Sequence, residues 1–212
     1  WWGNLVTFDS YRDEWLSEAL ANYSALLYLE KLKGAKAVET VLEEYRKRLL
    51  RTDGEGRTYE SAGPVVFGVR IRSSNPAAWQ SITYEKASWI LHMLRGRLGD
   101  GPFLAMLAQL VKDFATRPMS SEDLRRAAAR HLPKGVPDPQ LEDFFDTWVY
   151  GTGVPQLDLT HRVLGSGVKT EVEVTVRQSK VNAEFAMDVP VEILLPKGRR
   201  VVRWVRTGAE AE

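Results

Sequence analysis

The residue types and segments that the sequence lacks exclude several classes of protein and site. Its 212 residues include no cysteine, which excludes disulfide frameworks, thiolate metal sites and cysteine nucleophiles while leaving the cellular compartment open. Lysine and arginine (29) almost balance aspartate and glutamate (28), so the net charge of +1 gives no electrostatic case for nucleic acid or an anionic membrane. No apolar run reaches the length of a transmembrane helix. We therefore expect neither a nucleic acid nor a membrane as partner.

Histidine is also scarce, with three residues in the chain. His92 falls on an expected helix, His131 at a helix end and His161 on an expected strand. No two of them have the spacing of a metal-binding pair. We interpret all three as structural.

What is present is an ordinary globular composition, 44% hydrophobic, with helical patterns over most of the chain. The first expected helix has an unusually broad apolar surface and ends at a C-capping Gly34, while Ser120 begins a capping signature. Residues 52–80 are rich in Gly, Pro, Ser and Asn and are expected to be mostly loop. The expected helices span residues 12–33, 35–50, 82–98, 102–114, 121–131 and 139–151.

After Gly151 the hydrophobic period changes to the alternation of half-buried strands. Strands are expected at residues 169–177, 189–195 and 201–205, with a weaker candidate at 157–164 and a turn at 196–198. These few strands would make an incomplete sandwich with an open edge. The prediction is an α+β fold, with a helical lobe over residues 1–154 and a partial antiparallel β-sandwich over residues 155–212.

Glu18 is the first candidate functional residue, because it sits on the apolar first helix. A buried ionised carboxylate is costly unless a cation or a metal compensates its charge. From composition alone the alternative is a helix acid that faces solvent or pairs with Arg12 or Lys31. The residues around Glu18 bear on this choice.

Two sequence motifs lie at and before Glu18 with a fixed spacing between them: WWGNLVT at residues 1–7 and WLSEALA at residues 15–21. Both resemble the M1 family of zinc aminopeptidases, the gluzincins, in which eighteen residues separate a helical H-E-x-x-H from a glutamate that completes the zinc site. Ala19 and Ser17 depart from the usual Gly and Asn. Counted back from Glu18, the second family histidine would lie two residues before Trp1. The resemblance implies that Glu18 is a zinc ligand.

Tyr84 is the second candidate, in the stretch ITYEKASWIL of residues 82–91. Taken alone, it is a tyrosine near a helix start that could be core or surface. The stretch resembles the family's Y-x-K-G-x-x-x-L element, with Ala87 in place of the Gly. The resemblance implies that the Tyr84 hydroxyl stabilises the oxyanion, as a neutral phenol can. Lys86 is interpreted as structural. Asp13 could orient a zinc-bound histidine, or be an exposed acid in the first helical turn.

The resemblance implies a helical lobe of a thermolysin-like peptidase domain and a complete protein that removes N-terminal residues from peptides with zinc-activated water. The 212 residues lack the two zinc histidines, the general base and the G-x-M-E-N element that holds the substrate amine. We therefore expect this chain alone to be inactive and to hold no zinc tightly. Its expected partners are a peptide substrate and an upstream catalytic segment, and an uncovered apolar surface would favour self-association.

Two other classes of function stay open. One is a non-catalytic M1-like scaffold that makes protein contacts after losing its metal, in which case the upstream H-E-x-x-H would be broken. The other is a plain helical interaction module with a β appendage. Under this second interpretation, the match of the two motifs at residues 1–7 and 15–21 would be a coincidence.

Overall fold

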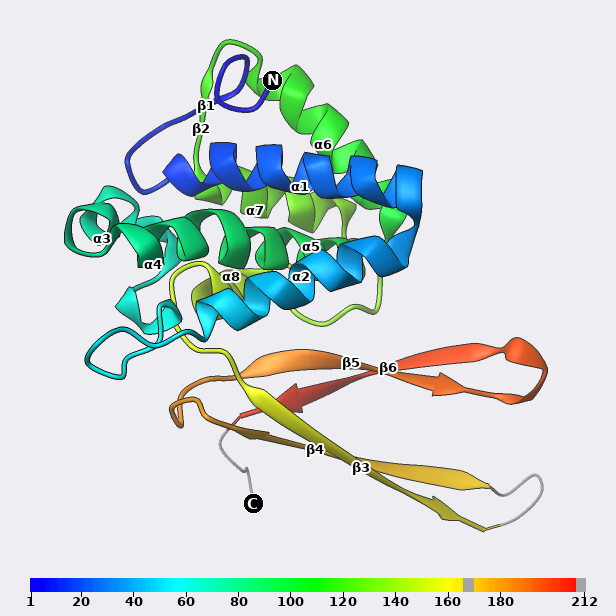
Figure 1. The fold of residues 1–212 in the computed structure, drawn as a ribbon. Helices are drawn as coiled ribbons and strands as arrows, with labels where there is room; N and C mark the ends of the chain where they lie inside the picture. The colour runs from blue at the N-terminus through cyan, green and yellow to red at the C-terminus, as the bar shows by residue number, and fades with distance from the viewer. Residues whose placement is uncertain (166–169, 209–212) are drawn as a thin grey trace. The chain divides into compact units, whose positions relative to one another are not determined.

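The computed structural model describes residues 1–165 and 170–208 (Figure 1). The chain divides into two compact units, Trp1–Thr152 and Gly153–Glu212, and each is described by itself. The division falls two residues before the expected boundary between residues 154 and 155. Within the described residues, no helix is long and apolar enough to cross a membrane.

The first unit is helical and contains one small parallel strand pair. Strand β1 (Thr7–Phe8) pairs with β2 (Pro118–Met119), so the start of the chain is tied to the segment before α7. The α-helices are α1 (Glu14–Lys33), α2 (Ala35–Leu49), α3 (Val69–Ser74), α4 (Pro76–Gln80), α5 (Ala87–Leu98), α6 (Asp100–Phe114), α7 (Ser121–His131) and α8 (Glu142–Trp148). Two 3-10 turns, η1 (Glu60–Ala62) and η2 (Val65–Phe67), and a π-helix, η3 (Ser81–Lys86), complete it.

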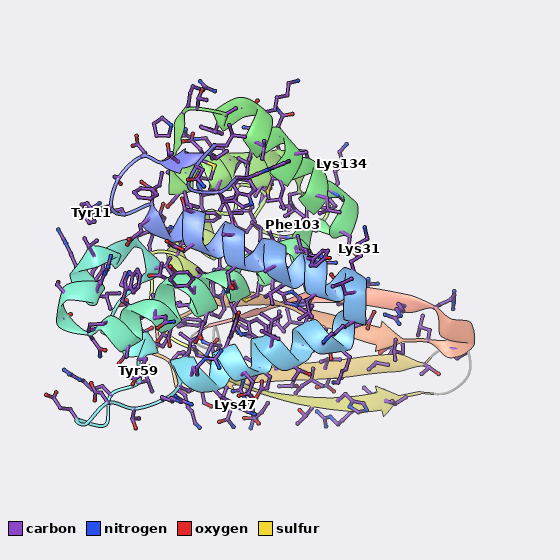
Figure 2. The ribbon with its side chains drawn as sticks, turned by 45° about the horizontal axis from the view of Figure 1, so that its top comes forward. Tyr11, Lys31, Lys47, Tyr59, Phe103 and Lys134 are labelled. Atoms are coloured by element: carbon purple, nitrogen blue, oxygen red, sulfur yellow. The ribbon has the colours of Figure 1, made fainter. Side chains whose placement is uncertain are left out.

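Helix α1 is the centre of the helical core. Its buried positions recur at helical spacing and face α2, α5 and η3. Tyr23 of α1 meets Phe103 of α6 edge to face, with ring centroids 5.7 Å apart. Figure 2 labels Phe103. Burial of such rings is among the largest contributions to a core. The buried residues of α1 are Trp15, Leu16, Ala19, Leu20, Tyr23 and Leu26.

The capping predictions are confirmed. Gly34 ends α1 with a φ of 81°, a conformation that side-chain-bearing residues rarely adopt. Ser120 forms a capping box with Asp123 at the start of α7: the Ser120 hydroxyl accepts from the Asp123 amide, and the Asp123 carboxylate accepts from the Ser120 amide. Local side-chain chemistry therefore fixes these two helix ends.

Several helical expectations need correction. The first helix begins at Glu14 rather than at residue 12, the fourth at Asp100 rather than at 102, and the sixth at Glu142 rather than at 139. The start of the expected third helix, Ser81–Lys86, is π-helical. Residues 52–80 are not mostly loop, because η1, η2, α3 and α4 occupy most of the stretch from residue 60 to residue 80. Helix α4 begins with Pro76 after an Asn75 cap whose Oδ1 accepts from the Ala78 amide at 3.0 Å.

The second unit contains two antiparallel hairpins. Strand β3 (Gln156–Leu164) pairs with β4 (Glu171–Ser179), and β5 (Met187–Leu194) pairs with β6 (Arg200–Thr207) through the turn η5 (Pro196–Gly198). The α+β class is therefore confirmed, with hairpins as its β component. The expected strand start at Lys169 lies outside the described residues. The Thr207 hydroxyl donates to Gln178 Oε1 at 2.7 Å and so joins β6 to β4.

Candidate active-site residues

The helical core brings Glu18 and Tyr84 together. Glu18 lies on α1 and Tyr84 in η3, and both side chains are half-buried. Burial, the hydrogen bond to Glu18 and the charge of that carboxylate together raise the pKa of Tyr84 to about 12. The phenol is therefore protonated at neutral pH and stands beside a carboxylate.

Glu18 makes no ion pair within residues 1–165 and 170–208. The alternative of a carboxylate paired with Arg12 or Lys31 is thus not what the fold contains. Its polar neighbour is the Tyr84 hydroxyl. A half-buried carboxylate without a compensating cation is the environment in which a metal ion would be stabilising.

Trp79 lies beside Tyr84. Its ring meets that of Tyr84 edge to face at 5.8 Å, and its Nε1 donates to Glu14 Oε2 at 3.4 Å. The Arg72 guanidinium lies 4.9 Å from the Trp79 ring centroid. The charge of Glu14 raises the pKa of Tyr84, and that of Arg72 lowers it. The Trp79 ring therefore packs against Tyr84, and the charges of Glu14 and Arg72 act on the Tyr84 hydroxyl in opposite directions.

Gly68 allows the segment before α3 to approach α1 closely. It has a φ of 44°, and a Cβ at this position would lie 2.6 Å from the Tyr11 carbonyl oxygen and 3.1 Å from Glu14 Oε2. Glycine therefore fits here on two grounds, a left-handed backbone and a close backbone contact. This approach brings α3, with Arg72, to the candidate site.

The residues that follow Tyr84 are tied to the core by ion pairs. Glu85 Oε1 lies 2.6 Å from Arg48 Nε of α2. Lys86 is buried with its Nζ 2.8 Å from Glu60 Oε1 and 3.1 Å from the Gly151 carbonyl oxygen. Burial lowers the pKa of Lys86, whereas the charge of Glu60 opposes that shift. These contacts agree with a structural role for Lys86.

Asp13 is buried in a separate set of hydrogen bonds. Its Oδ1 accepts from the amide and the hydroxyl of Ser121, both at 2.7 Å, and its Oδ2 accepts from the Ser10 hydroxyl at 2.6 Å. It is therefore not an exposed acid of the first turn. Across the part of the chain that the structure describes, no hydrogen bond joins Asp13 to Glu18 or Tyr84. Asp13 fastens the start of α1 to α7.

The described residues do not form a complete metal site. Apart from residues 166–169 and 209–212, no group of three or more histidine, aspartate or glutamate side chains could hold a metal ion. His92 instead shares a hydrogen bond with Tyr23, whose hydroxyl lies 3.0 Å from His92 Nδ1. The carboxylate of Glu18 is chemically suited to be one zinc ligand among several.

The family model described as the peptidase family M1 domain matches residues 1–148. The chain belongs to this family, so the resemblance inferred from residues 1–7, 15–21 and 82–91 is confirmed. The match lies within the helical unit.

Curated relatives of two kinds match the chain. Aminopeptidase M1-B of Oryza sativa subsp. japonica is 28% identical over 73% of this chain and 17% of its own length. The transcription initiation factor TFIID subunit 2 of Saccharomyces cerevisiae is 26% identical over 82% of this chain and 12% of its own length. The chain thus spans less than a fifth of these two relatives.

Solved structures share the fold. A mutant M1 zinc metallopeptidase from Deinococcus radiodurans, bound to a Tyr-Ser-Ala substrate, matches with a TM-score of 0.56 and 24% identity over 74% of this chain and 32% of that one. Legionella pneumophila aminopeptidase A, in complex with aspartic acid, has a TM-score of 0.63 and 20% identity over 98% of this chain and 21% of that one. At these identities the likeness concerns the fold alone.

Proposed function

We propose that this chain supplies the third zinc ligand, Glu18, and the oxyanion-binding tyrosine, Tyr84, of an aminopeptidase of family M1. The observation that carries the proposal is the packing of α1 on η3, which brings the Tyr84 hydroxyl close enough to the Glu18 carboxylate for its charge to raise the pKa of Tyr84. The family motifs imply both roles, and the fold brings both residues to one place. The two zinc histidines and the general base would come from a segment of the complete protein outside these 212 residues.

The chemistry of the two side chains suits hydrolysis of a peptide bond. Zinc, when bound, supplies an activated water and polarises the substrate carbonyl. Glu18 offers its carboxylate oxygens without a competing ion pair in the described residues. Tyr84, with a pKa of about 12, keeps its proton at neutral pH and can donate a hydrogen bond to an oxygen that gains negative charge. Carboxylate and phenol thus have separate tasks.

The test is the zinc content and peptidase activity of the complete protein that contains this chain. Wild type should hold one zinc per chain and release N-terminal residues from peptides. Glu18→Ala should weaken or abolish zinc binding, because a metal ligand is lost. Tyr84→Phe should retain zinc while kcat falls about a hundred-fold, the usual effect of removing one oxyanion donor.

Glu14→Gln is the matched control, because Glu14 lies one turn before Glu18 on α1 and also acts on the pKa of Tyr84. It should leave the zinc content unchanged. Wild-type protein without zinc would contradict the proposal. Equal zinc loss in Glu14→Gln and Glu18→Ala would contradict the assignment of Glu18 as the ligand.

A second candidate function is a non-catalytic scaffold with an M1 fold. The similarity to a transcription factor subunit favours it, because that relative is not named as a peptidase. In a scaffold the complete protein would hold no zinc, and Tyr84→Phe would change only stability. The same zinc measurement therefore separates the two functions.

The exposed apolar side chains suggest how the isolated chain behaves. Tyr28 and Leu32 of α1 are 64% and 61% exposed, and Trp1 is 80% exposed. We propose that the upstream catalytic segment covers such surface in the complete protein and that the isolated chain self-associates through it. Light scattering should give a mass that rises with concentration. A constant monomer mass at high concentration would contradict self-association.

A further inference from the structure

Asn22 lies one helical turn after Glu18 on α1, so the two side chains occupy neighbouring positions on one face of the helix. Its Nδ2 donates to Ser88 Oγ at 2.9 Å and to the Tyr84 carbonyl oxygen at 3.4 Å. Its amide is also bonded to the Tyr45 hydroxyl, which lies 3.1 Å from Nδ2 and 3.3 Å from Oδ1. One amide group therefore joins α1, α2, η3 and α5.

The Tyr84 carbonyl lies close to the end of the π-helix η3, which α5 continues in α-helical register. It also accepts a hydrogen bond from the Ser88 hydroxyl at 2.7 Å. A π-helical segment has less favourable backbone geometry than an α-helix and commonly occurs at functional sites. Side-chain bonds to its carbonyl can therefore hold a register that the backbone alone does not prefer.

Three consecutive residues of η3 are bonded to three different elements. The Tyr84 carbonyl is bonded to Asn22 of α1, the Glu85 carboxylate to Arg48 of α2, and the Lys86 ammonium to Glu60 of η1. The last two bonds fix η3 relative to elements that do not carry the zinc-ligand candidate. Of the three, the bond from Asn22 is the one that starts on the helix of Glu18.

We propose that Asn22 is a positioning residue that sets the placement of Tyr84 relative to Glu18. Asn22 touches the backbone of Tyr84 and not its hydroxyl, so its effect acts through the register of η3. Its catalytic consequence rests on the proposed peptidase function, whereas its structural consequence can be measured in this chain alone. A small displacement of a catalytic group is enough to slow a reaction strongly.

The test replaces Asn22 by Leu, which has a similar volume and no amide, and by Ala as a smaller second variant. Ser24→Ala is the matched control, because half-buried Ser24 also makes a tertiary bond from α1, to Trp2 Nε1 at 3.1 Å, without touching η3. In the zinc-loaded complete protein, both Asn22 variants should lower kcat about ten- to a hundred-fold. KM and zinc content should stay at the wild-type values, and Ser24→Ala should leave kcat unchanged.

The second readout is NMR of the 212-residue chain, where the Tyr84 and Trp79 rings lie 5.8 Å apart. Cross-peaks between the two rings should weaken in the Asn22 variants and persist in Ser24→Ala. Unchanged cross-peaks in both Asn22 variants, or an equal loss of kcat in Ser24→Ala, would overturn the positioning role. An inactive wild-type protein would instead contradict the proposed peptidase function, and the NMR readout alone would then decide on Asn22.

Discussion

The two units of the chain differ in how their side chains are sheltered from solvent. The helical unit buries whole aromatic and aliphatic side chains, among them Trp15, Phe103 and Phe145. In the β unit every residue of β3 is exposed, and the buried apolar side chains among its described residues are Phe185 and Val191. Tight packing therefore accompanies the candidate active site, whereas the hairpins carry no comparable core.

This difference agrees with the position of the candidate site in the helical unit. Catalytic groups must be held within fractions of an ångström, and neighbours that are themselves locked by packing provide that precision. Glu18 lies about one turn after the fully buried Trp15 on α1, and the sequence neighbours of Tyr84 in η3, Thr83 and Glu85, are both buried. The following predictions test this contrast, beginning with the largest expected effect.

Removal of an ion pair should give the largest difference in unfolding free energy between the two units. The side chains of Lys86 and Glu60 are 3% and 5% exposed, so Lys86→Ala leaves the Glu60 carboxylate buried without its ammonium. The expected loss is about 3–5 kcal/mol of unfolding free energy. Arg162→Ala removes an exposed pair with Glu173 in the β unit and should cost less than about 1 kcal/mol. Residue-resolved hydrogen exchange measures each unit separately. Equal losses would break the contrast.

Truncation of an apolar side chain should also cost the helical unit more unfolding free energy than the β unit, with a smaller effect than loss of the buried ion pair. Leu94 of α5 is fully buried, and Leu94→Ala should lower the unfolding free energy by about 3 kcal/mol, since a cavity is left. Leu159 of β3 is 54% exposed, and Leu159→Ala should change the value by no more than about 0.5 kcal/mol. Urea unfolding, followed by circular dichroism for helices and by exchange for hairpins, provides the comparison. A loss of several kcal/mol in Leu159→Ala would contradict the exposed position of Leu159 on β3.

Much of the fold was predictable because the signals are local. The broad apolar surface of α1, the glycine at its end and the capping box at Ser120 each act over a few residues. Helices α3 and α4 were missed because six and five residues are too short for a 3.6-residue period to emerge. Asn75 followed by Pro76 was the available signal for α4, since an asparagine cap and a proline in the first turn mark a helix start.

The candidate site was predictable only in part. Glu18 and Tyr84 were found through their resemblance to family motifs, since no spacing rule connects residues so far apart in the chain. The π-register of η3 and the contacts of Asn22 and Trp79 depend on tertiary packing, which composition and periodicity do not record. Asp13 was open to two interpretations because its partner Ser121 lies far along the sequence. Sequence thus indicated the two candidate groups, Glu18 and Tyr84, and did not indicate the residues that contact Tyr84.

The capping box of α7 should contribute less than the buried ion pair or the core leucine. Ser120→Ala removes the hydroxyl that accepts from the Asp123 amide at 3.2 Å, and the expected loss is about 1 kcal/mol of unfolding free energy. Ser120→Asn is the control, because asparagine also caps helices and should restore most of the loss. Thermal unfolding of both variants gives the difference. A full loss in Ser120→Asn would mean that the hydroxyl does more than cap the helix.

The smallest expected effect is a pH dependence confined to the helical unit. Burial lowers the pKa of His92 below 6.5, and the charge of Arg95 lowers it too, against Glu30 and Glu39. Because the unfolded chain then binds the proton more tightly, His92 should reduce the unfolding free energy as the pH falls below about 6.5. His92→Gln should remove that part of the acid sensitivity. Denaturant unfolding of wild type and His92→Gln across this range measures the difference. Identical pH profiles would mean that His92 is hydrated in the native state, and the helical core would then be less closed at α5 than its packing indicates.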